Sequence, residues 1–152
     1  MEHILVRSGK REDIPSILNL IKELAAYEKE PNAVVISEEA LMNDAFGTDS
    51  AFEFIVAEHD GIVVGTAIFY YCYSTWRGKY IYLEDLIVTK QHRRLGIGGK
   101  LFEALIKRTR AEGLRQFGWQ VLDWNNLAID FYKKYNATLD ESWVNGRLYF
   151  NP

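Results

Sequence analysis

Hydrophobic positions in the first third of the chain recur mainly with helical spacing. Residues 3–8 read as a short strand, and over residues 14–27 apolar side chains return every three or four positions. This pattern predicts a helix with Asp13 as its N-cap and Pro15 in its first turn, where proline is tolerated. A serine followed by two glutamates predicts a second helix over residues 37–46, which the next residue, a glycine, ends.

The middle of the chain changes to the composition and alternation of β-strands. Residues 51–59 and 62–73 are rich in β-branched and aromatic side chains, and they flank an Asp-Gly pair of the kind that two-residue hairpin turns prefer. After a polar loop at 74–79, residues 80–88 form a third run of the same kind. We therefore expect a long hairpin and an adjacent strand, which together make an antiparallel meander.

Helical and strand patterns alternate again in the last third of the chain. Residues 101–113 predict an amphipathic helix, residues 115–122 a strand, and residues 143–150 a closing strand or hairpin. Asn125 or Asn126 can cap a further helix between the two strands, with an expected apolar face of Leu127, Phe131 and Tyr135.

The resulting element order predicts an α+β fold in which helices flank one mixed, mostly antiparallel central sheet. The chain shows no internal repeat, low-complexity tract or linker, and its length suits one domain of the usual ~100–150 residues. We therefore expect residues 1–152 to form a single domain.

Composition narrows the range of partners. The 18 basic residues face 21 acidic ones, and the net charge of −3 gives no reason to expect nucleic acid or an anionic membrane as a partner. The N-terminal stretch has too short an apolar run for a signal peptide or membrane span, so the expected location is cytoplasmic. One cysteine, Cys72, excludes an internal disulfide, and its apolar neighbours favour a packed core thiol over a nucleophile.

The glycine-rich, basic stretch at 91–100, QHRRLGIGGK, joins a predicted strand to a predicted helix. Such a turn offers unpaired backbone N–H groups and the positive end of a helix dipole, a combination that binds phosphate. The Walker pattern fails because Lys100 is followed by Leu101, and the dinucleotide fingerprint fails because a third glycine would have to replace that leucine. Two interpretations stay open: a different pyrophosphate site, or a loop with glycines for turning and arginines for solubility.

Within this stretch Arg93-Arg94-Leu95-Gly96-Ile97-Gly98 resembles the R/Q-x-x-G-x-G/A motif of the GNAT superfamily of N-acetyltransferases. Residues 20–30, 73–88 and 121–137 resemble its diamine acetyltransferase branch, which contains the spermidine/spermine and thialysine N-acetyltransferases. The similarity runs nearly end to end, and the combinations YSTW and VLDWN are closer to the thialysine-type members. The resemblance implies a GNAT-type domain that uses acetyl-CoA, with no metal.

The resemblance also implies how acetyl-CoA is held. Backbone N–H groups of a bulged strand would bind the pantetheine arm and the thioester oxygen, the turn would bind the pyrophosphate, and an asparagine would lie near the thiol. Lysines near the phosphates could equally be solvated charges. The implied cofactor residues are Leu86, Ile87, Val88, Arg93, Arg94, Leu95, Gly96, Ile97, Gly98, Gly99, Lys100, Asn125 and Lys133 or Lys134.

Acetyl transfer to an amine requires a base for the amine and an acid for the departing thiolate. A lysine-like amine has a pKa of ~10.4, so neutralising it at pH 7 costs on the order of 4–5 kcal/mol. The resemblance implies Glu84 as the base, acting through water, and Tyr132 as the acid. The alternatives are a solvated Glu84-Asp85 pair at a sheet edge and a tyrosine of the core, although carboxylates inside a run that otherwise reads as buried need a partner or a task.

The expected acceptor site is acidic and aromatic. Glu28, Glu84 and Asp85 would attract a cationic amine, and Tyr27 and Trp76 would supply aromatic faces. Polyamine-specific members of the branch carry an acidic residue two positions before the loop tryptophan, where this chain has Ser74, and a carboxylate near the last strand, where this chain has SWVNG. The chain is therefore expected to prefer a small, thialysine-like amine over a polyamine.

Two rival functions stay open. A protein lysine or N-terminal acetyltransferase would need a broader, less acidic groove, and a non-catalytic acyl-CoA-binding module would need neither Glu84 nor Tyr132. Members of the branch are dimers, so a homodimer that uses the aromatic C-terminal strand is also expected.

Overall fold

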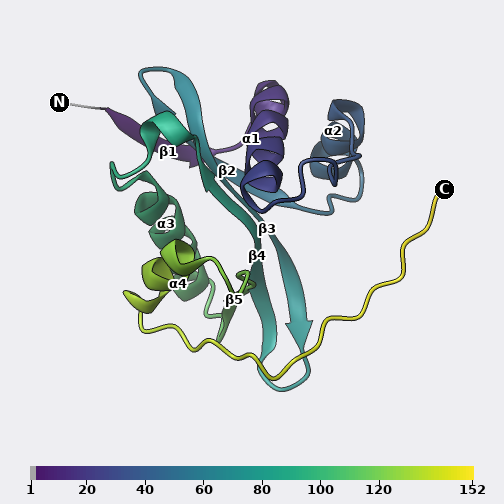
Figure 1. Ribbon diagram of the computed structural model, residues 1–152, viewed down its shortest axis with the longest axis vertical. Helices are drawn as coiled ribbons and strands as arrows, with labels where there is room; N and C mark the ends of the chain where they lie inside the picture. The colour runs from purple at the N-terminus through teal and green to yellow at the C-terminus, as the bar shows by residue number, and fades with distance from the viewer. Residues whose placement is uncertain (1–2) are drawn as a thin grey trace. The chain divides into compact units, whose positions relative to one another are not determined.

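The computed structural model describes residues 3–152 and contains one five-stranded sheet, all of it within a compact unit that ends at Gln120 (Figure 1). The order of the strands in the sheet equals their order in the chain, and the first four pair antiparallel while the last pairs parallel. The predicted α+β class and the mixed, mostly antiparallel sheet are confirmed. The strands are β1 (Ile4–Ser8), β2 (Glu53–His59), β3 (Ile62–Ser74), β4 (Gly78–Val88) and β5 (Phe117–Trp119).

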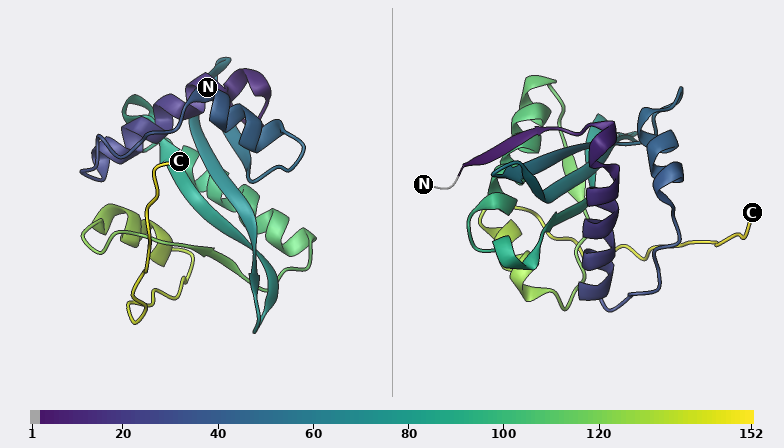
Figure 2. Two further views of the ribbon diagram at one scale, coloured as in Figure 1. Left: turned by 90° about the vertical axis from the view of Figure 1, so that its right-hand side faces the viewer. Right: turned by 90° about the horizontal axis from the view of Figure 1, so that it is seen from above.

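Helices cover both faces of this sheet (Figure 2). On one face Ile68 of β3 packs in a core cluster with Ile17 and Leu18 of α1 (Ile14–Tyr27) and with Leu41 of α2 (Glu38–Phe46). On the opposite face the guanidinium of Arg108 in α3 (Ile97–Ala111) lies 4.9 Å from the ring centroid of Phe69. Because neighbouring strand residues point to opposite faces, β3 serves both layers.

The hairpin turn and the second helix form as predicted. Asp60 and Gly61 have φ angles of 50° and 82°, the two positive values that a type I′ turn requires. The hydroxyl oxygen of Ser37 accepts the N–H of Ala40 at 3.1 Å and so caps α2.

The first helix begins where the sequence places it, but Asp13 does not cap it. Pro15 lies in the first turn, and no side-chain capping hydrogen bond starts the helix. The carboxylate of Asp13 instead accepts hydrogen bonds from the guanidinium of Arg7 at 2.8 and 3.0 Å and from the N–H of Lys10 at 2.7 Å. Arg7 also donates to Glu58 at 2.7 Å, so Asp13 belongs to a charged link between the helix entry and β2.

The second unit, Val121–Pro152, holds one helix, α4 (Asn126–Lys133). The side-chain oxygen of Asn125 caps it by accepting the N–H of Ala128 at 3.3 Å, as predicted. The expected apolar face is wrong, because the helix ends at Lys133, Leu127 is 72% exposed and the buried residue of the helix is Tyr132.

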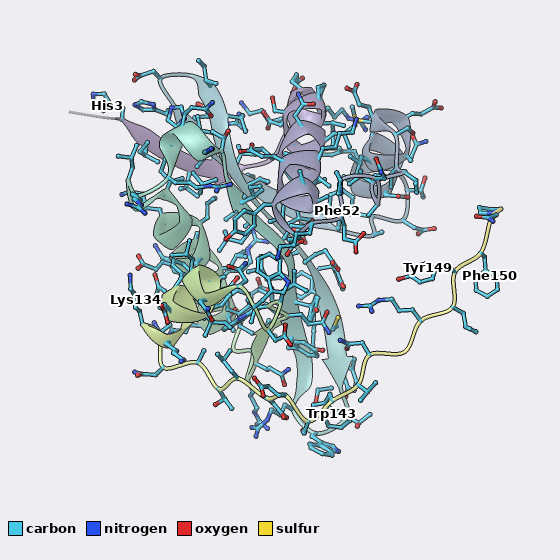
Figure 3. The ribbon with its side chains drawn as sticks, viewed as in Figure 1. His3, Phe52, Lys134, Trp143, Tyr149 and Phe150 are labelled. Atoms are coloured by element: carbon cyan, nitrogen blue, oxygen red, sulfur yellow. The ribbon has the colours of Figure 1, made fainter. Side chains whose placement is uncertain are left out.

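Of the two strands predicted near the C-terminus, the first is shorter than expected and the second is absent from the described residues. β5 spans three residues rather than 115–122, and the described residues 137–152 contain no helix or strand. The carboxylate of Asp140 accepts the N–H of Ser142 at 2.9 Å and the indole N–H of Trp143 at 3.0 Å, a local arrangement that competes with strand pairing. Trp143, Tyr149 and Phe150 of this segment are exposed (Figure 3).

Cys72 is half-buried in β3 and pairs across the ladder with Tyr80, so it is not a fully buried core thiol. Among the described residues, no helix combines the length and the apolar character that crossing a membrane requires.

The charged link at the entry to α1 generates a stability prediction. Burial raises the pKa of Asp13, but the hydrogen bonds from Arg7 and Lys10 outweigh it and lower the pKa below its usual value. A depressed carboxyl pKa stabilises the fold at pH values above the unfolded-state pKa of ~3.9. This stabilisation is lost as the pH falls from that value through the lower folded-state pKa. Asp13→Asn is therefore expected to lower the free energy of unfolding by roughly 1–2 kcal/mol at pH 7 in urea denaturation.

At pH 3 the difference between Asp13→Asn and the unsubstituted chain should be clearly smaller than at pH 7, because the unfolded chain then binds a proton at this carboxyl, and it should vanish only below the lowered folded-state pKa. Asp49→Asn, at an exposed position, is the control and should change neither measurement. A loss of the same size at both pH values would contradict an electrostatic role for Asp13.

Candidate functional site

A β-bulge in β4 shapes the candidate site. Phe69 of β3 pairs with Leu83, whereas the preceding residue, Ile68, pairs with Asp85, so Glu84 is the extra residue with no partner across the ladder. A bulge of this kind bends the strand and changes which face the following side chains point to.

The bulge brings two consecutive carboxylates to one face of the sheet. Tyr70 and Ile68 are two residues apart on β3 and share a face, so their partners Tyr82 and Asp85 share it too. The hydroxyl of Tyr70 donates a hydrogen bond to Oε1 of Glu84 at 2.9 Å, which places Glu84 on the same side. This face is the one covered by α1, because Ile68 packs in the α1 core cluster.

Glu28, the residue that follows the end of α1 and serves as its C-cap, adds a third carboxylate to the same region. Burial raises its pKa, and the charge of Glu84 raises it further, which shows that the two carboxylates lie within electrostatic range. The structure therefore brings together Glu28, Glu84 and Asp85, the three acidic residues that the sequence assigned to the amine.

Asp85 is the carboxyl most strongly affected by this grouping. Burial raises its pKa to about 7, with further contributions from the charges of Glu84 and Glu28. An anion that is poorly solvated and repelled by its neighbours gains most from a bound cation. The cluster is thus suited to take up an ammonium group.

Beyond the bulge, β4 has one open side. The parallel pairing with β5 covers only Ile81 to Leu83, and no described strand pairs with this side of β4 after Leu83. The N–H of Thr89 donates to the carbonyl of Val64 in β3 at 2.9 Å, so by strand alternation the N–H groups of Leu86 and Val88 point to the open side. Of the three predicted cofactor-binding N–H groups, that of Ile87 points toward β3 instead.

The glycine-rich turn opens α3 as expected, although the helix starts at Ile97, four residues earlier than its apolar pattern indicates. Gly96 is the N-cap with φ 78°, in the left-handed region that favours glycine. The first turn, which includes Gly98, Gly99 and the exposed Lys100, carries no acidic residue. Its unpaired N–H groups form a site that could hold a phosphate.

Arg93 lies within a set of protein contacts rather than projecting freely. Its Nε donates to the carbonyl of Val88 at 2.9 Å, and its guanidinium lies 5.4 Å from the ring centroid of Tyr27 and 3.8 Å from the carboxylate of Glu23. Glu23 also accepts the N–H of Lys90 at 2.9 Å. The start of the turn is therefore fastened to α1, whereas Arg94 and Leu95 are exposed.

Trp76 is separated from Glu84 and Asp85 by the first half of β4. It lies in the turn between β3 and β4 with 85% of its surface exposed, and the seven β4 residues from Gly78 to Glu84 span about 20 Å, six steps of ~3.3 Å each. The side-chain oxygen of Ser74 accepts the N–H groups of Trp76 and Arg77 at 3.2 and 3.1 Å and stabilises this turn.

Three predicted site residues belong to the second unit. Asn125 caps α4, Tyr132 is buried in its last turn with its ring 5.3 Å from that of Phe131, and Lys133 is exposed at its end. Their roles in binding and catalysis stay predictions.

Sequence reasoning missed Tyr70 and Glu23. Both lie in ordinary strand or helix patterns, and only the register of β3 against β4 and the approach of α1 to the turn reveal their contacts. No local signal in the sequence marks either residue.

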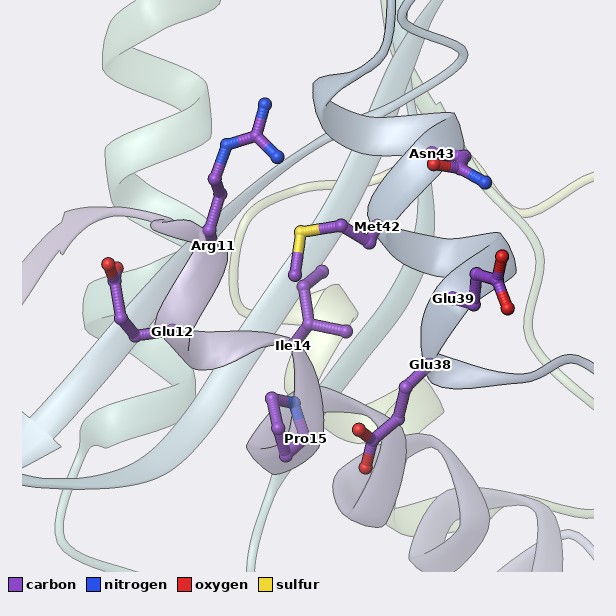
Figure 4. A pocket seen from close by; sticks show the side chains of 8 residues that line it. All are labelled: Arg11, Glu12, Ile14, Pro15, Glu38, Glu39, Met42 and Asn43. Carbon is purple, nitrogen blue, oxygen red and sulfur yellow. The ribbon is translucent and has the colours of Figure 1, made fainter.

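Elsewhere in the first unit, a surface pocket of about 350 Å³ lies between the start of α1 and α2 (Figure 4). Arg11, Pro15, Glu38 and Met42 are among its lining residues, and none of the predicted site residues lines it. No cluster of three or more His, Cys, Asp or Glu side chains suited to hold a metal ion occurs in the part of the chain that the structure describes.

Several known proteins are similar to this chain. The family model for the acetyltransferase (GNAT) family matches residues 16–137. A thialysine N-epsilon-acetyltransferase from Sus scrofa is 41% identical over 159 residues, which cover 97% of this chain and 94% of that protein. The Caenorhabditis elegans protein of the same name is 36% identical over 87% of this chain and 83% of its own length.

A similar solved structure is that of an aminoglycoside acetyltransferase from an uncultured soil metagenomic sample. Its TM-score is 0.78, and the match covers 97% of both chains at 23% sequence identity. This likeness concerns the fold, and it confirms the predicted GNAT-type architecture.

The raised pKa of Asp85 generates a stability prediction of opposite sign to that for Asp13. A carboxyl whose pKa rises from ~3.9 to about 7 on folding binds more protons in the folded state, so its ionisation destabilises the fold as the pH rises between those values. Asp85→Asn is therefore expected to raise the free energy of unfolding by roughly 1–3 kcal/mol at pH 8. Urea denaturation at pH 8 and pH 4.5 measures the effect.

At pH 4.5 most of the gain should disappear, because Asp85 is then protonated in the fold. Asp49→Asn again provides the exposed control. Equal gains at both pH values, or a loss of stability at pH 8, would show that Asp85 is not held in an unfavourable charged state.

Proposed function

The chain belongs to the GNAT family of acetyltransferases and is related to the thialysine and diamine N-acetyltransferases, and on this basis we propose that it acetylates the primary amine of a small, thialysine-like acceptor. Family membership implies acetyl-CoA as the acetyl donor. The observation that carries the choice of acceptor is the grouping of Glu28, Glu84 and Asp85, which suits a compact cation.

The residues on the first unit fit the acetyl donor. The first turn of α3 offers N–H groups without a competing carboxylate, and the outward N–H groups of Leu86 and Val88 can bind the amide-rich pantetheine arm. We propose that residues 93–100 bind the pyrophosphate and that Asn125 and Lys133 of the second unit contribute further contacts. The whole of residues 1–152 is proposed to act as one catalytic domain.

In the proposed mechanism the acceptor enters as an ammonium ion attracted by the carboxylates. Its proton passes to Glu84, directly or through water, and the nitrogen lone pair forms a bond to the acetyl carbon while the bond from that carbon to sulfur breaks. Tyr132 gives its phenolic proton to the departing thiolate. The acetylated nitrogen then loses its second proton, which restores the phenol of Tyr132 through water, and the product is a neutral amide. Neutralising the amine costs on the order of 4–5 kcal/mol at pH 7 for a pKa of ~10.4.

A thioether in the acceptor chain reduces this cost, because electron withdrawal by sulfur lowers the pKa of the amine. The relatives named as thialysine N-epsilon-acetyltransferases from Sus scrofa and Bos taurus are 41% and 40% identical to this chain, whereas human spermidine/spermine N(1)-acetyltransferase-like protein 1, which also matches 94% of this chain, is 32% identical. Both points favour thialysine-like acceptors over polyamines.

A homodimer is part of the proposal. The segment at 143–150 exposes large apolar side chains, among them Trp143, Leu148, Tyr149 and Phe150, which a second copy could cover. Mass measurement by light scattering would show twice the 17.6 kDa of one chain if this is correct.

The test of the function is thiol release from acetyl-CoA with thialysine, lysine, spermidine, putrescine and a lysine-containing peptide as acceptors. Thialysine should give the highest kcat/KM. Tyr132→Phe should lower kcat by about 10²–10⁴-fold, the usual contribution of general acid catalysis, while acetyl-CoA still binds. Tyr135→Phe, three residues further along and beyond the end of α4, is the matched control and should retain activity.

Turnover of the peptide without turnover of the free amines would replace the proposal by protein acetylation. Binding of acetyl-CoA without turnover on any acceptor would instead favour a non-catalytic acyl-CoA-binding module.

A further inference from the structure

We propose that Tyr70 is a positioning residue that holds the carboxylate of Glu84 in place for proton transfer, an inference that rests on the proposed function. The hydroxyl of Tyr70 on β3 donates to Oε1 of Glu84 on β4 at 2.9 Å. Tyr70 is not among the residues that the sequence pattern or the family motif identifies.

Glu84 requires such a contact because of its place in the strand. As the extra residue of the bulge it has no partner across the β3–β4 ladder, and its side chain is exposed. An exposed glutamate has three rotatable side-chain bonds, so without a fixed contact its carboxylate would sample many positions. One hydrogen bond from the neighbouring strand restricts that range.

Tyr70 is well suited to provide this contact. Its ring lies against that of its ladder partner Tyr82, with centroids 5.4 Å apart and planes tilted by 39°, so the position of the hydroxyl is set by packing within the sheet. Burial raises the pKa of Tyr70, and the bond to Glu84 raises it further. The phenol therefore stays protonated throughout the working pH range and acts as a donor.

The contact also assigns different roles to the two oxygens of Glu84. Because Oε1 accepts the hydrogen bond from Tyr70, Oε2 is the oxygen better placed to accept the proton of the amine or of a bridging water. Tyr70 thus acts on the reaction only through Glu84.

Tyr71 provides a matched control on the same strand. Its hydroxyl also donates to a glutamate, Glu112 at the end of α3, at 2.9 and 2.8 Å, but on the opposite face of the sheet. Tyr70→Phe and Tyr71→Phe therefore remove the same hydroxyl and the same kind of hydrogen bond, inside and outside the proposed site.

Tyr70→Phe should lower kcat for thialysine roughly tenfold, the equivalent of one hydrogen bond to a charged group. KM for acetyl-CoA should not change. Tyr71→Phe should leave kcat and KM unchanged. An unchanged kcat in Tyr70→Phe, or equal effects of the two variants on kcat, would overturn the proposal.

The double variant separates this proposal from the proposed function. If Tyr70 acts through Glu84, Tyr70→Phe should have no further effect on kcat in a Glu84→Gln background. Additive losses would overturn the positioning role alone, leaving Glu84 as the base. Full activity of Glu84→Gln would overturn the assignment of Glu84 as the base and the role of Tyr70 with it, and absence of acetyl transfer by the unsubstituted chain would overturn the proposed function itself.

Discussion

The bulge at Glu84 is the constraint on which the candidate site depends. Regular alternation along β4 would send Glu84 and Asp85 to opposite faces of the sheet, one toward α1 and the other toward α3. The extra residue shifts the alternation by one step, so both carboxylates face α1 and the carboxylate of Glu28. The same irregularity occurs one residue after the β5 pairing ends, so beyond it β4 has an open side.

The concentration of negative charge makes the site costly to the fold. The α1 face of the sheet carries a core cluster of aliphatic and aromatic side chains, and an ionised Asp85 on this face is poorly solvated and repelled by two neighbours, which raises its pKa. The carboxylate of Asp13 in the same unit is stabilised in its charged form instead. It is paired with Arg7, and its pKa is lowered. An unpaired carboxylate cluster is the arrangement expected where a cation from outside supplies the missing charge.

Features encoded by a few adjacent residues could be predicted from the sequence, and features set by pairing between distant segments could not. The Asp60-Gly61 turn, the Ser37 and Asn125 caps and the glycine that opens α3 all follow from local chemistry. The bulge depends on the register of two strands and is expected only from the family resemblance, and neither the shared face of the carboxylates nor the contact from Tyr70 could be read from the chain. Residues 143–150 have strand composition but no partner strand in the described structure, and without one their N–H and C=O groups gain nothing from an extended form.

The order of features along β4 explains how one short segment can serve two ligands of opposite charge. Glu84 and Asp85 provide a negative field at the bulge, Leu86 and Val88 follow with outward N–H groups, and the basic turn at 93–100 begins α3 only a few residues later. In the proposed function, a cationic amine and a polyanionic cofactor would each be attracted to a different end of this segment, and the neutral amide groups lie between the two ends. The near balance of charge over the whole chain, −3 in total, therefore conceals two strong local fields. Because both charged regions belong to one continuous segment, from β4 through the turn into α3, the chain itself limits how far apart they can lie. In the proposed function this closeness would help to bring the reacting ends of the two ligands together.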